Sequence, residues 1–328
     1  MTSPLISPPM KSGLYYNLEQ HFQSFHDFPV ITDLDNLDAD IAILGIPFGD
    51  PYSMAEASND QALAPTHIRR HCGRALRGLD RYDFDIGGTL LNGENVKVVD
   101  CGDVVGISKD VAGNHDRSQE VVKKILKSGA LPIILGGDHS IPIPVFRAYE
   151  GRGPINLIQV DAHIDWRDTF HGVSDGLSSV IRRASEMKHI HEIFQIGLRS
   201  AGSARPEEVA AARSYGAHLI PDHELQEIGM QAVLDQIPDG EDYYLTIDAD
   251  GVDPSIMPAV AGPAPGGVTY GQMRTLIQGL VKKGNVVGMD IVEITPARDI
   301  NGITAITAGR FICNLIGSAV RAGYFKKN

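Results

Sequence analysis

Histidine and aspartate side chains gather in three short clusters that are far apart in the chain. The clusters are GGDHS at 136–140, DAHID at 161–165 and DADGVDP at 248–254. If the clusters meet in the folded protein, their carboxylates repel one another strongly unless cations lie between them. A pair of divalent metal ions is the simplest remedy, and two-metal sites activate water for hydrolysis. The residue types therefore predict a metal-dependent hydrolase.

Each cluster follows a short apolar run, at 131–135, 155–160 and 243–247. Runs of this length are typical of buried parallel strands, which are hydrophobic almost throughout. In open α/β sheets, ligands bind in the crevice at the carboxyl ends of the strands. We therefore expect the three clusters to converge at one edge of a sheet.

The spacing within the clusters suits metal ligation. Asp161, His163 and Asp165 alternate in sequence, so an extended backbone would place them on one face. The candidate ligands are His139, Asp161, His163, Asp165, Asp248 and Asp250. This set of oxygens and imidazoles favours Mn(II), with Ni(II), Co(II) or Fe(II) as alternatives, and its lack of thiolates argues against structural zinc. Taken singly, each cluster also fits an ordinary turn or helix cap.

The rest of the chain alternates between predicted strands and helices. Further strands are expected at 40–45, 96–100, 193–198, 218–220 and 286–291, and helices at 65–77, 118–128, 143–148, 178–187, 206–215, 229–236, 270–283 and 304–320. Such alternation predicts βαβ units and a parallel sheet. We expect one catalytic domain over 39–328, preceded by an arm at 1–38 whose aromatic residues indicate that it packs on another surface, for example that of a neighbouring subunit.

The composition of the chain argues against a nucleic-acid-binding, disulfide-rich or membrane protein. The 328-residue chain is 43% hydrophobic and carries a net charge of −12, which argues against nonspecific nucleic-acid binding and weakly favours cationic ligands. Cys72, Cys101 and Cys313 are too few and too widely spaced for a disulfide framework or a zinc knuckle. We find no apolar stretch of about 20 residues and no signal peptide. These features predict a cytoplasmic protein that does not associate with membranes.

The clusters, together with DADGVDP continuing to the PGG turn at 265–267 and GMDIVEITP at 288–296, closely resemble those of the ureohydrolases. This family includes arginase, agmatinase and guanidinobutyrase, and the segments at 165–168 and 178–187 look agmatinase-like. The resemblance implies a three-layer α/β/α fold around an eight-stranded parallel sheet, an arginase-like architecture. It also implies a homo-oligomer, either trimer or hexamer.

The resemblance implies a role for each residue of the site. His139, Asp161, Asp165 and Asp248 would hold one metal ion, and Asp161, His163, Asp248 and Asp250 the other, so that Asp161 and Asp248 bridge them. A hydroxide between the ions would attack the guanidinium carbon and release urea and an amine. Asp250 would also orient this hydroxide. Glu293 matches the guanidinium-binding carboxylate, since a carboxylate pairs bidentately with a planar guanidinium; a surface or capping glutamate is the alternative.

The sequence departs from the family pattern at two places that bear on the substrate. Asp175 stands where many members carry a histidine, and His171 lies a few residues earlier, either as an alternative catalytic group or as a surface loop histidine. Asp175 in the pocket would favour a cationic tail. The loop after the first strand, at 49–61, also differs from that of agmatinases. Tyr52, Met54 and Trp166 are candidate pocket-wall residues, with ordinary packing as the alternative.

These departures leave the substrate open. Agmatine, guanidinobutyrate, guanidine, an alkyl guanidine and a biguanide such as metformin all fit a small cationic guanidino substrate. A non-catalytic subunit, paired with an active paralogue in a mixed oligomer, is the main rival interpretation. A mononuclear zinc amidohydrolase is a second, although it would need fewer carboxylates. The retention of every candidate ligand and of Glu293 favours an active enzyme.

Overall fold

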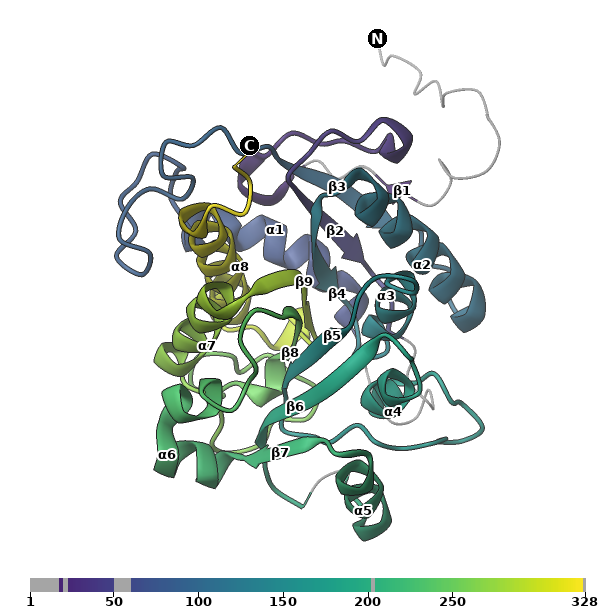
Figure 1. The fold of residues 1–328 in the computed structure, drawn as a ribbon. Helices are drawn as coiled ribbons and strands as arrows, with labels where there is room; N and C mark the ends of the chain where they lie inside the picture. Colours follow the sequence, from purple (N-terminus) through teal and green to yellow (C-terminus); the bar gives the residue numbers. More distant parts are fainter. Residues whose placement is uncertain (1–17, 20–22, 50–59, 202–203, 327–328) are drawn as a thin grey trace.

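The protein folds around a single twisted sheet. The computed structural model describes residues 18–19, 23–49, 60–201 and 204–326. Across these ranges the sheet has nine strands in the order β1-β3-β2-β4-β9-β8-β5-β6-β7 (Figure 1). The strands are β1 (Leu18–Glu19), β2 (Ile41–Ile46), β3 (Val98–Val104), β4 (Leu131–Gly136), β5 (Ile155–Val160), β6 (Ile190–Leu198), β7 (His218–Pro221), β8 (Asp242–Asp248) and β9 (Asn285–Val292). β2 to β9 are all parallel, which confirms the eight-stranded parallel sheet; the short β1 adds an antiparallel edge.

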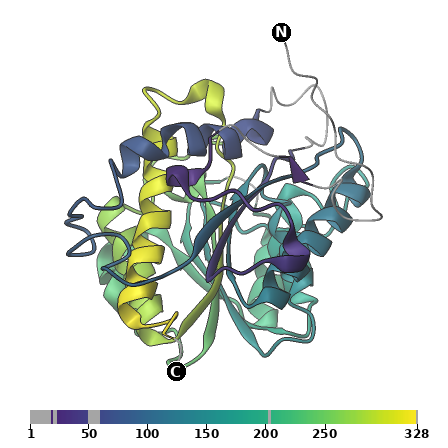
Figure 2. The ribbon, with the colours of Figure 1, turned by 90° about the horizontal axis from the view of Figure 1, so that it is seen from above.

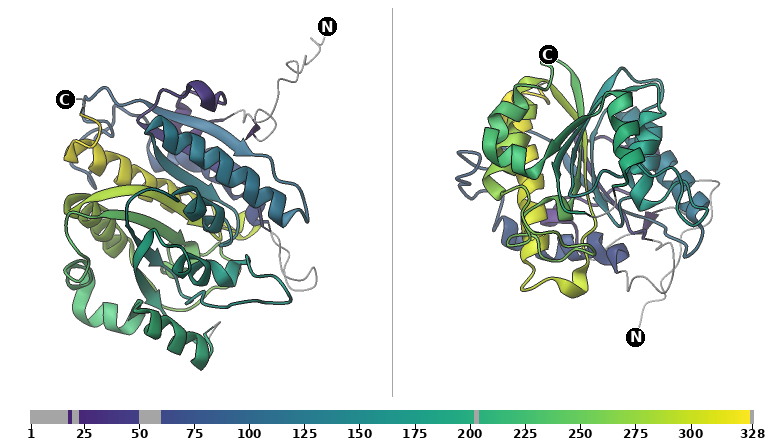
Figure 3. Two further views of the ribbon diagram at one scale, coloured as in Figure 1. Left: turned by 45° about the vertical axis from the view of Figure 1, so that its right-hand side comes forward. Right: turned by 90° about the horizontal axis from the view of Figure 1, so that it is seen from below.

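Helices cover both faces of this sheet. They are α1 (Ala64–Ala75), α2 (Val111–Ser128), α3 (Pro142–Ala148), α4 (Val180–Ser185), α5 (Pro206–Tyr215), α6 (Asp222–Leu234), α7 (Tyr270–Lys283) and α8 (Ile303–Ala322). α1, α6, α7 and α8 pack on one face, and α2, α3, α4 and α5 on the other. Views along the sheet show the three layers (Figures 2 and 3). The expected three-layer α/β/α fold is therefore confirmed.

The apolar runs form strands because both of their faces are buried. In β2, Ile41 and Ile43 belong to the apolar cluster under α1 and α8, whereas Ala42 and Leu44 belong to the cluster under α2 and α3. This alternation follows from the two-residue period of a strand. Since both clusters exclude water, the residues of β2 are apolar on both faces of the sheet.

Two helices begin about two turns before the residue at which the hydrophobic pattern predicts their start. α2 begins at Val111 rather than Ser118, because the Asp110 side chain accepts a hydrogen bond from the backbone of Gly113 and caps the helix. α6 begins at Asp222 rather than Gly229, which lies inside the helix at φ 78 and kinks it. In both cases the helix extends into a segment with weak apolar periodicity, and at α2 the Asp110 cap accounts for the extension.

The described part of the N-terminal arm packs on the protein's own core. Phe25 and Phe28 are buried in the apolar cluster that includes α1. Of the described helices, α8 is long and apolar enough to cross a membrane by length and composition alone. However, 78% of that window is buried inside the structure, as expected for a core helix. The sequence predicted this helix, but the expectation that the chain has no apolar stretch of about 20 residues was wrong for it.

The strands that carry the polar clusters are neighbours. β4, β9, β8 and β5 are adjacent in the middle of the sheet. Since these four strands are parallel, their carboxyl ends meet at one edge. This edge is therefore the place where the sequence clusters come together.

Candidate metal centre and active site

His139 reaches the centre of the site from the turn after β4. Gly137 makes this turn possible, because a Cβ at that position would lie 1.5 Å from the backbone oxygen of Phe48. The backbone N–H of Asp138 donates to the same Phe48 oxygen at 2.9 Å. The turn therefore packs directly against the end of β2, and only glycine fits there.

The cluster after β5 does not continue as an extended strand. β5 ends at Val160, and Asp165 has a positive φ of 49, so Asp161, His163 and Asp165 are not placed by simple alternation as we expected. Instead the backbone N–H of His163 donates to Oδ1 of Asp161 at 2.6 Å. The backbone oxygen of Asp165 accepts hydrogen bonds from Ile181 and Arg182, at the start of α4. The local turn and α4 thus hold these side chains in place.

The cluster after β8 forms a short 3-10 turn at Ala249–Gly251. Oδ1 of Asp248 accepts the backbone N–H of Asp250 at 2.8 Å, which closes this turn. Gly251 lies so close to β5 that a Cβ there would be 2.4 Å from the backbone nitrogen of Asp161. This close approach brings the second and third sequence clusters side by side.

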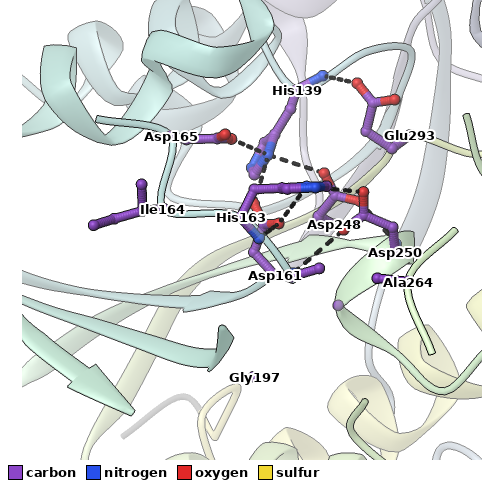
Figure 4. Close-up of polar contacts among 12 residues, drawn as sticks. His139, Asp161, His163, Ile164, Asp165, Gly197, Asp248, Asp250, Ala264 and Glu293 are labelled. Carbon is purple, nitrogen blue, oxygen red and sulfur yellow. Dashed lines mark hydrogen bonds and ion pairs between the residues drawn. The ribbon is translucent and has the colours of Figure 1, made fainter. Parts of the chain in front are cut away.

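The predicted ligands converge in two groups that share one carboxylate (Figure 4). In the first group, Nδ1 of His139 lies 3.0 Å from Oδ2 of Asp161, 2.8 Å from Oδ2 of Asp165 and 3.1 Å from Oδ2 of Asp248. In the second, Nδ1 of His163 lies 3.5 Å from Oδ1 of Asp161 and 3.2 Å from Oδ2 of Asp250. Asp161 therefore presents one oxygen to each group, as a bridging ligand would.

The donor set fits a pair of divalent cations. Nδ1 of His139 is fully buried and makes no well-aligned hydrogen bond within the described residues, although three carboxylate oxygens surround it. Its other nitrogen, Nε2, lies 3.4 Å from the hydroxyl of Thr246, which donates to Asp290 at 2.7 Å. With its proton on Nε2, His139 turns the Nδ1 lone pair toward the carboxylates, and this tautomer is the one that binds metal.

The pKa values of the clustered side chains also favour metal binding. Burial would lower the pKa of His163, but Asp161 and Asp250 outweigh it and raise the pKa to about 12. Burial, reinforced by Asp161, raises the pKa of Asp165 to about 6. Burial and the neighbouring carboxylates also raise the pKa of Asp248. Without cations this cluster must hold protons to relieve its charge, and metal binding would replace those protons.

Glu293 lies next to the metal ligands, at the end of β9 (Figure 4). Its Oε1 accepts the backbone N–H of His139 at 2.8 Å, and its own N–H donates to the backbone oxygen of Gly137 at 2.8 Å. Burial, with the nearby Asp138 charge, raises the pKa of Glu293 to about 8. A cation placed beside this carboxylate would stabilise its ionised form.

Two polar side chains that the sequence analysis overlooked support this site. Gln159 interrupts the apolar run of β5, and its amide donates to Oδ2 of Asp161 at 2.6 Å. Gln61 is buried, and its amide donates to Oε2 of Glu293. A polar residue within a buried strand could have identified Gln159. Gln61 is the last residue of the segment 49–61, whose difference from agmatinases is the only sequence signal that points to it.

The other predicted substrate contacts are placed differently. The carboxylate of Asp175 pairs with Arg147 at 2.8 Å and lies 3.8 Å from His115, and these two groups, His115 first, lower its pKa. Its charge is therefore already balanced, which weakens the expectation that it binds a cationic tail.

Two aromatic candidates have other surroundings than a substrate pocket would give them. His171 is exposed, with a positive φ of 48 and its ring 4.2 Å from that of Phe170. Trp166 is 3% exposed and packs in an apolar cluster beside Tyr215, so it is a core residue rather than a pocket wall. Tyr52 and Met54 lie outside the described residues.

Comparison with known proteins agrees with this geometry. The Arginase family profile matches residues 39–317. The chain is 31% identical over 312 residues to a guanidinopropionase of Pseudomonas aeruginosa, covering 91% of this chain and 93% of that protein. It is 30% identical over 295 residues to a mitochondrial agmatinase of Gallus gallus, covering 88% and 83% respectively.

A solved structure shows the same likeness in three dimensions. Proclavaminate amidino hydrolase from Streptomyces clavuligerus superposes with a TM-score of 0.80 at 26% identity, covering 94% of this chain and 100% of that one. The site geometry, the family profile and this fold lead to one conclusion. The chain belongs to the arginase family of metal-dependent hydrolases, which act on guanidino carbon–nitrogen bonds.

Proposed function

We propose that this protein hydrolyses a small cationic guanidino compound to urea and an amine at a pair of divalent metal ions. The observation that carries the proposal is the sharing of Asp161 between the His139 group and the His163 group, with Glu293 bonded to the backbone of His139. Two ions held by these groups would supply an activated water beside a guanidinium bound to Glu293.

The chain's own residues bind and orient the substrate in this scheme. The buried Glu293 carboxylate offers two oxygens in one plane, which match two N–H groups of a planar guanidinium. Pairing with a cation favours the ionised form of Glu293, whose pKa is otherwise raised to about 8. The carboxylates of Asp161 and Asp248 are almost completely buried, so bulk water does not surround them, whereas His163 is partly exposed to solvent.

We propose an agmatine-like compound as the first substrate to test. The relatives named agmatinase and guanidinopropionase are equally similar to this chain but carry names of different substrates. Guanidinobutyrate, guanidine, alkyl guanidines and biguanides such as metformin therefore remain alternatives. We further propose Mn(II) as the metal, with Ni(II) as the alternative, and a cytoplasmic homo-oligomer, either trimer or hexamer.

The test is urea release by the purified protein, loaded separately with Mn(II) and with Ni(II). The panel contains agmatine, guanidinobutyrate, arginine, guanidine and dimethylbiguanide. Urea from one compound, abolished in Asp248→Ala and retained in Asp253→Asn, would support the proposal and identify both substrate and metal. Asp253 is a suitable control because its carboxylate accepts the backbone N–H of Ser255 and belongs to neither ligand group.

The rival function is a non-catalytic subunit that supports an active paralogue. The presence of the whole ligand set, together with Glu293, favours an active enzyme, because a silent subunit has no need to keep either. A protein that binds two metal ions but releases no urea from any compound would contradict the hydrolase proposal. Restoration of activity by a co-purifying paralogue would then establish the rival.

A further inference from the structure

Gln61 is a buried glutamine that lies beside Glu293, the carboxylate proposed to bind the guanidinium. It is 1% exposed and begins the 3-10 turn Gln61–Leu63 that leads directly into α1. The preceding residue, Asp60, accepts the backbone N–H of Ala297 through its side chain, at 2.6 Å. This bond ties the start of the turn to the segment that follows β9. The position of Gln61 is therefore set by α1 on one side and by the Glu293 region on the other.

The two oxygens of Glu293 have different partners. The backbone N–H of His139 donates to Oε1, and the side-chain amide of Gln61 donates to Oε2. Each carboxylate oxygen has two lone pairs, so each can still accept one N–H from a ligand. Two fixed donors therefore set the plane of the carboxylate and leave it open to a bidentate guanidinium.

The side chain of Gln61 also occupies space at Oε2. A guanidinium nitrogen paired with that oxygen would lie next to the Gln61 amide, because both would donate to Oε2. A methyl or larger group on this nitrogen would come closer to the buried amide than a hydrogen does, so we expect it to be disfavoured. Since both Gln61 and Glu293 are buried, neither can move aside without disturbing packed neighbours.

We propose that Gln61 positions the Glu293 carboxylate and selects guanidines that present an unsubstituted nitrogen at Oε2. This inference rests on the proposed guanidine hydrolase function. Through its bond to Glu293, Gln61 is a positioning residue, and through its volume beside Oε2 it determines specificity.

Two substitutions separate the two parts of this role. Gln61→Met keeps the volume of the side chain but removes the hydrogen-bond donor. Gln61→Ala removes both. The matched control is Gln231→Met on α6, where an exposed glutamine amide also donates to a carboxylate, that of Asp235 at 2.9 Å. Thermal melting and metal content are measured for each variant to confirm that the folded, metal-loaded protein is compared.

The experiment measures binding of methylguanidine and N,N′,N″-trimethylguanidine by calorimetry, and kcat and KM for any guanidine that the wild type hydrolyses. Gln61→Met is expected to weaken methylguanidine binding and raise KM by about tenfold or more, the loss of a hydrogen bond to a charged group. It should still prefer methylguanidine over the trimethyl compound. Gln61→Ala should lose that preference as well, and Gln231→Met should match the wild type.

The outcomes distinguish this inference from the proposed function. Unchanged affinity and KM in Gln61→Met would overturn the positioning role, and an unchanged preference in Gln61→Ala would overturn the selection role. A wild-type protein that binds methylguanidine but hydrolyses no guanidine would refute the hydrolase function. The affinities of the Gln61 variants for the two guanidines would then decide the role of Gln61. A wild type that neither binds nor hydrolyses guanidines would overturn both.

Discussion

The backbone N–H of His139 donates a hydrogen bond of 2.8 Å to Oε1 of Glu293, while the imidazole of the same residue faces Asp161, Asp165 and Asp248. One residue therefore joins the metal ligands to the carboxylate proposed to bind guanidinium. Because the peptide N–H and the buried imidazole belong to the same residue, the turn after β4 limits the distance between the metal ligands and the Glu293 carboxylate.

Replacement of Glu293 by glutamine tests this coupling. Glu293→Gln keeps an oxygen that can accept the His139 N–H, so we expect two metal ions per chain to remain bound. An uncharged amide cannot neutralise a guanidinium, so kcat/KM for urea release should fall by at least about a hundredfold. Urea assays and metal analysis check both parts, with the exposed Glu150→Gln as control. An undiminished kcat/KM would show that Glu293 does not anchor the substrate.

Metal removal should lower the stability of the fold. Asp161, Asp165, Asp248 and Asp250 are all buried in one cluster, and their repulsion is relieved by cations. At metal concentrations about a thousand times Kd, binding stabilises the folded state by about 4 kcal/mol. We expect the Tm to fall after chelation and to recover on adding Mn(II) or Ni(II).

The variant Asp161→Asn gives the matching control for metal removal. It removes the charge of the residue shared by both ligand groups, so its Tm should respond much less to added metal. If the wild-type Tm stays constant while metal analysis shows complete removal of the ions, the cluster is not a metal centre.

Glycine at position 137 should be essential for folding. In Gly137→Ala the new methyl group would lie 1.5 Å from the Phe48 backbone oxygen, so the turn or the end of β2 must move. We expect the free energy of unfolding to fall by about 3 kcal/mol or more. Gly73→Ala is the matched control, because this helical glycine has nothing within 4 Å and alanine there should stabilise α1 by about 0.5–1 kcal/mol. Equal effects in chemical denaturation would refute the packing argument.

His26 should make the stability of the protein depend on pH. Burial lowers the pKa of His26 from 6.5 to about 4, with Asp27 opposing and Arg310 reinforcing the shift. Between these two pH values the unfolded chain binds a proton that the folded protein does not. The free energy of unfolding should therefore fall as pH drops from 6.5 to 4, with a contribution of at most about 3 kcal/mol from this residue.

The variant His26→Asn isolates this contribution. Asparagine tolerates the positive φ of 50 at this position and does not titrate, so the variant should lose less stability than the wild type over the same pH range. Urea denaturation at several pH values measures the difference, and the exposed His191→Asn serves as control. Parallel curves for wild type and His26→Asn would exclude His26 as the titrating group.

Local sequence was enough to predict the elements that carry the site. The strands before His139, Asp161 and Asp248 are short apolar runs, and their pattern depends only on burial of both faces of the sheet. The helices α5 and α7 begin and end where the sequence predicts, because proline, capping residues and glycine or lysine mark their ends locally. α2 and α6 extend further, since caps and kinks there replace the apolar pattern.

The alternating strands and helices of the amino-acid sequence by themselves predicted a parallel sheet and the edge of the sheet where the histidines and aspartates meet, because these features depend on short-range patterns. The resemblance of the clusters to those of the ureohydrolases added the three-layer fold and the family. Only the tertiary structure decided that Gln61 bonds to Glu293, 232 residues away, and that Arg147 neutralises Asp175. Such pairs depend on how loops from separate strands approach one another in space, and no periodicity in the chain records that approach.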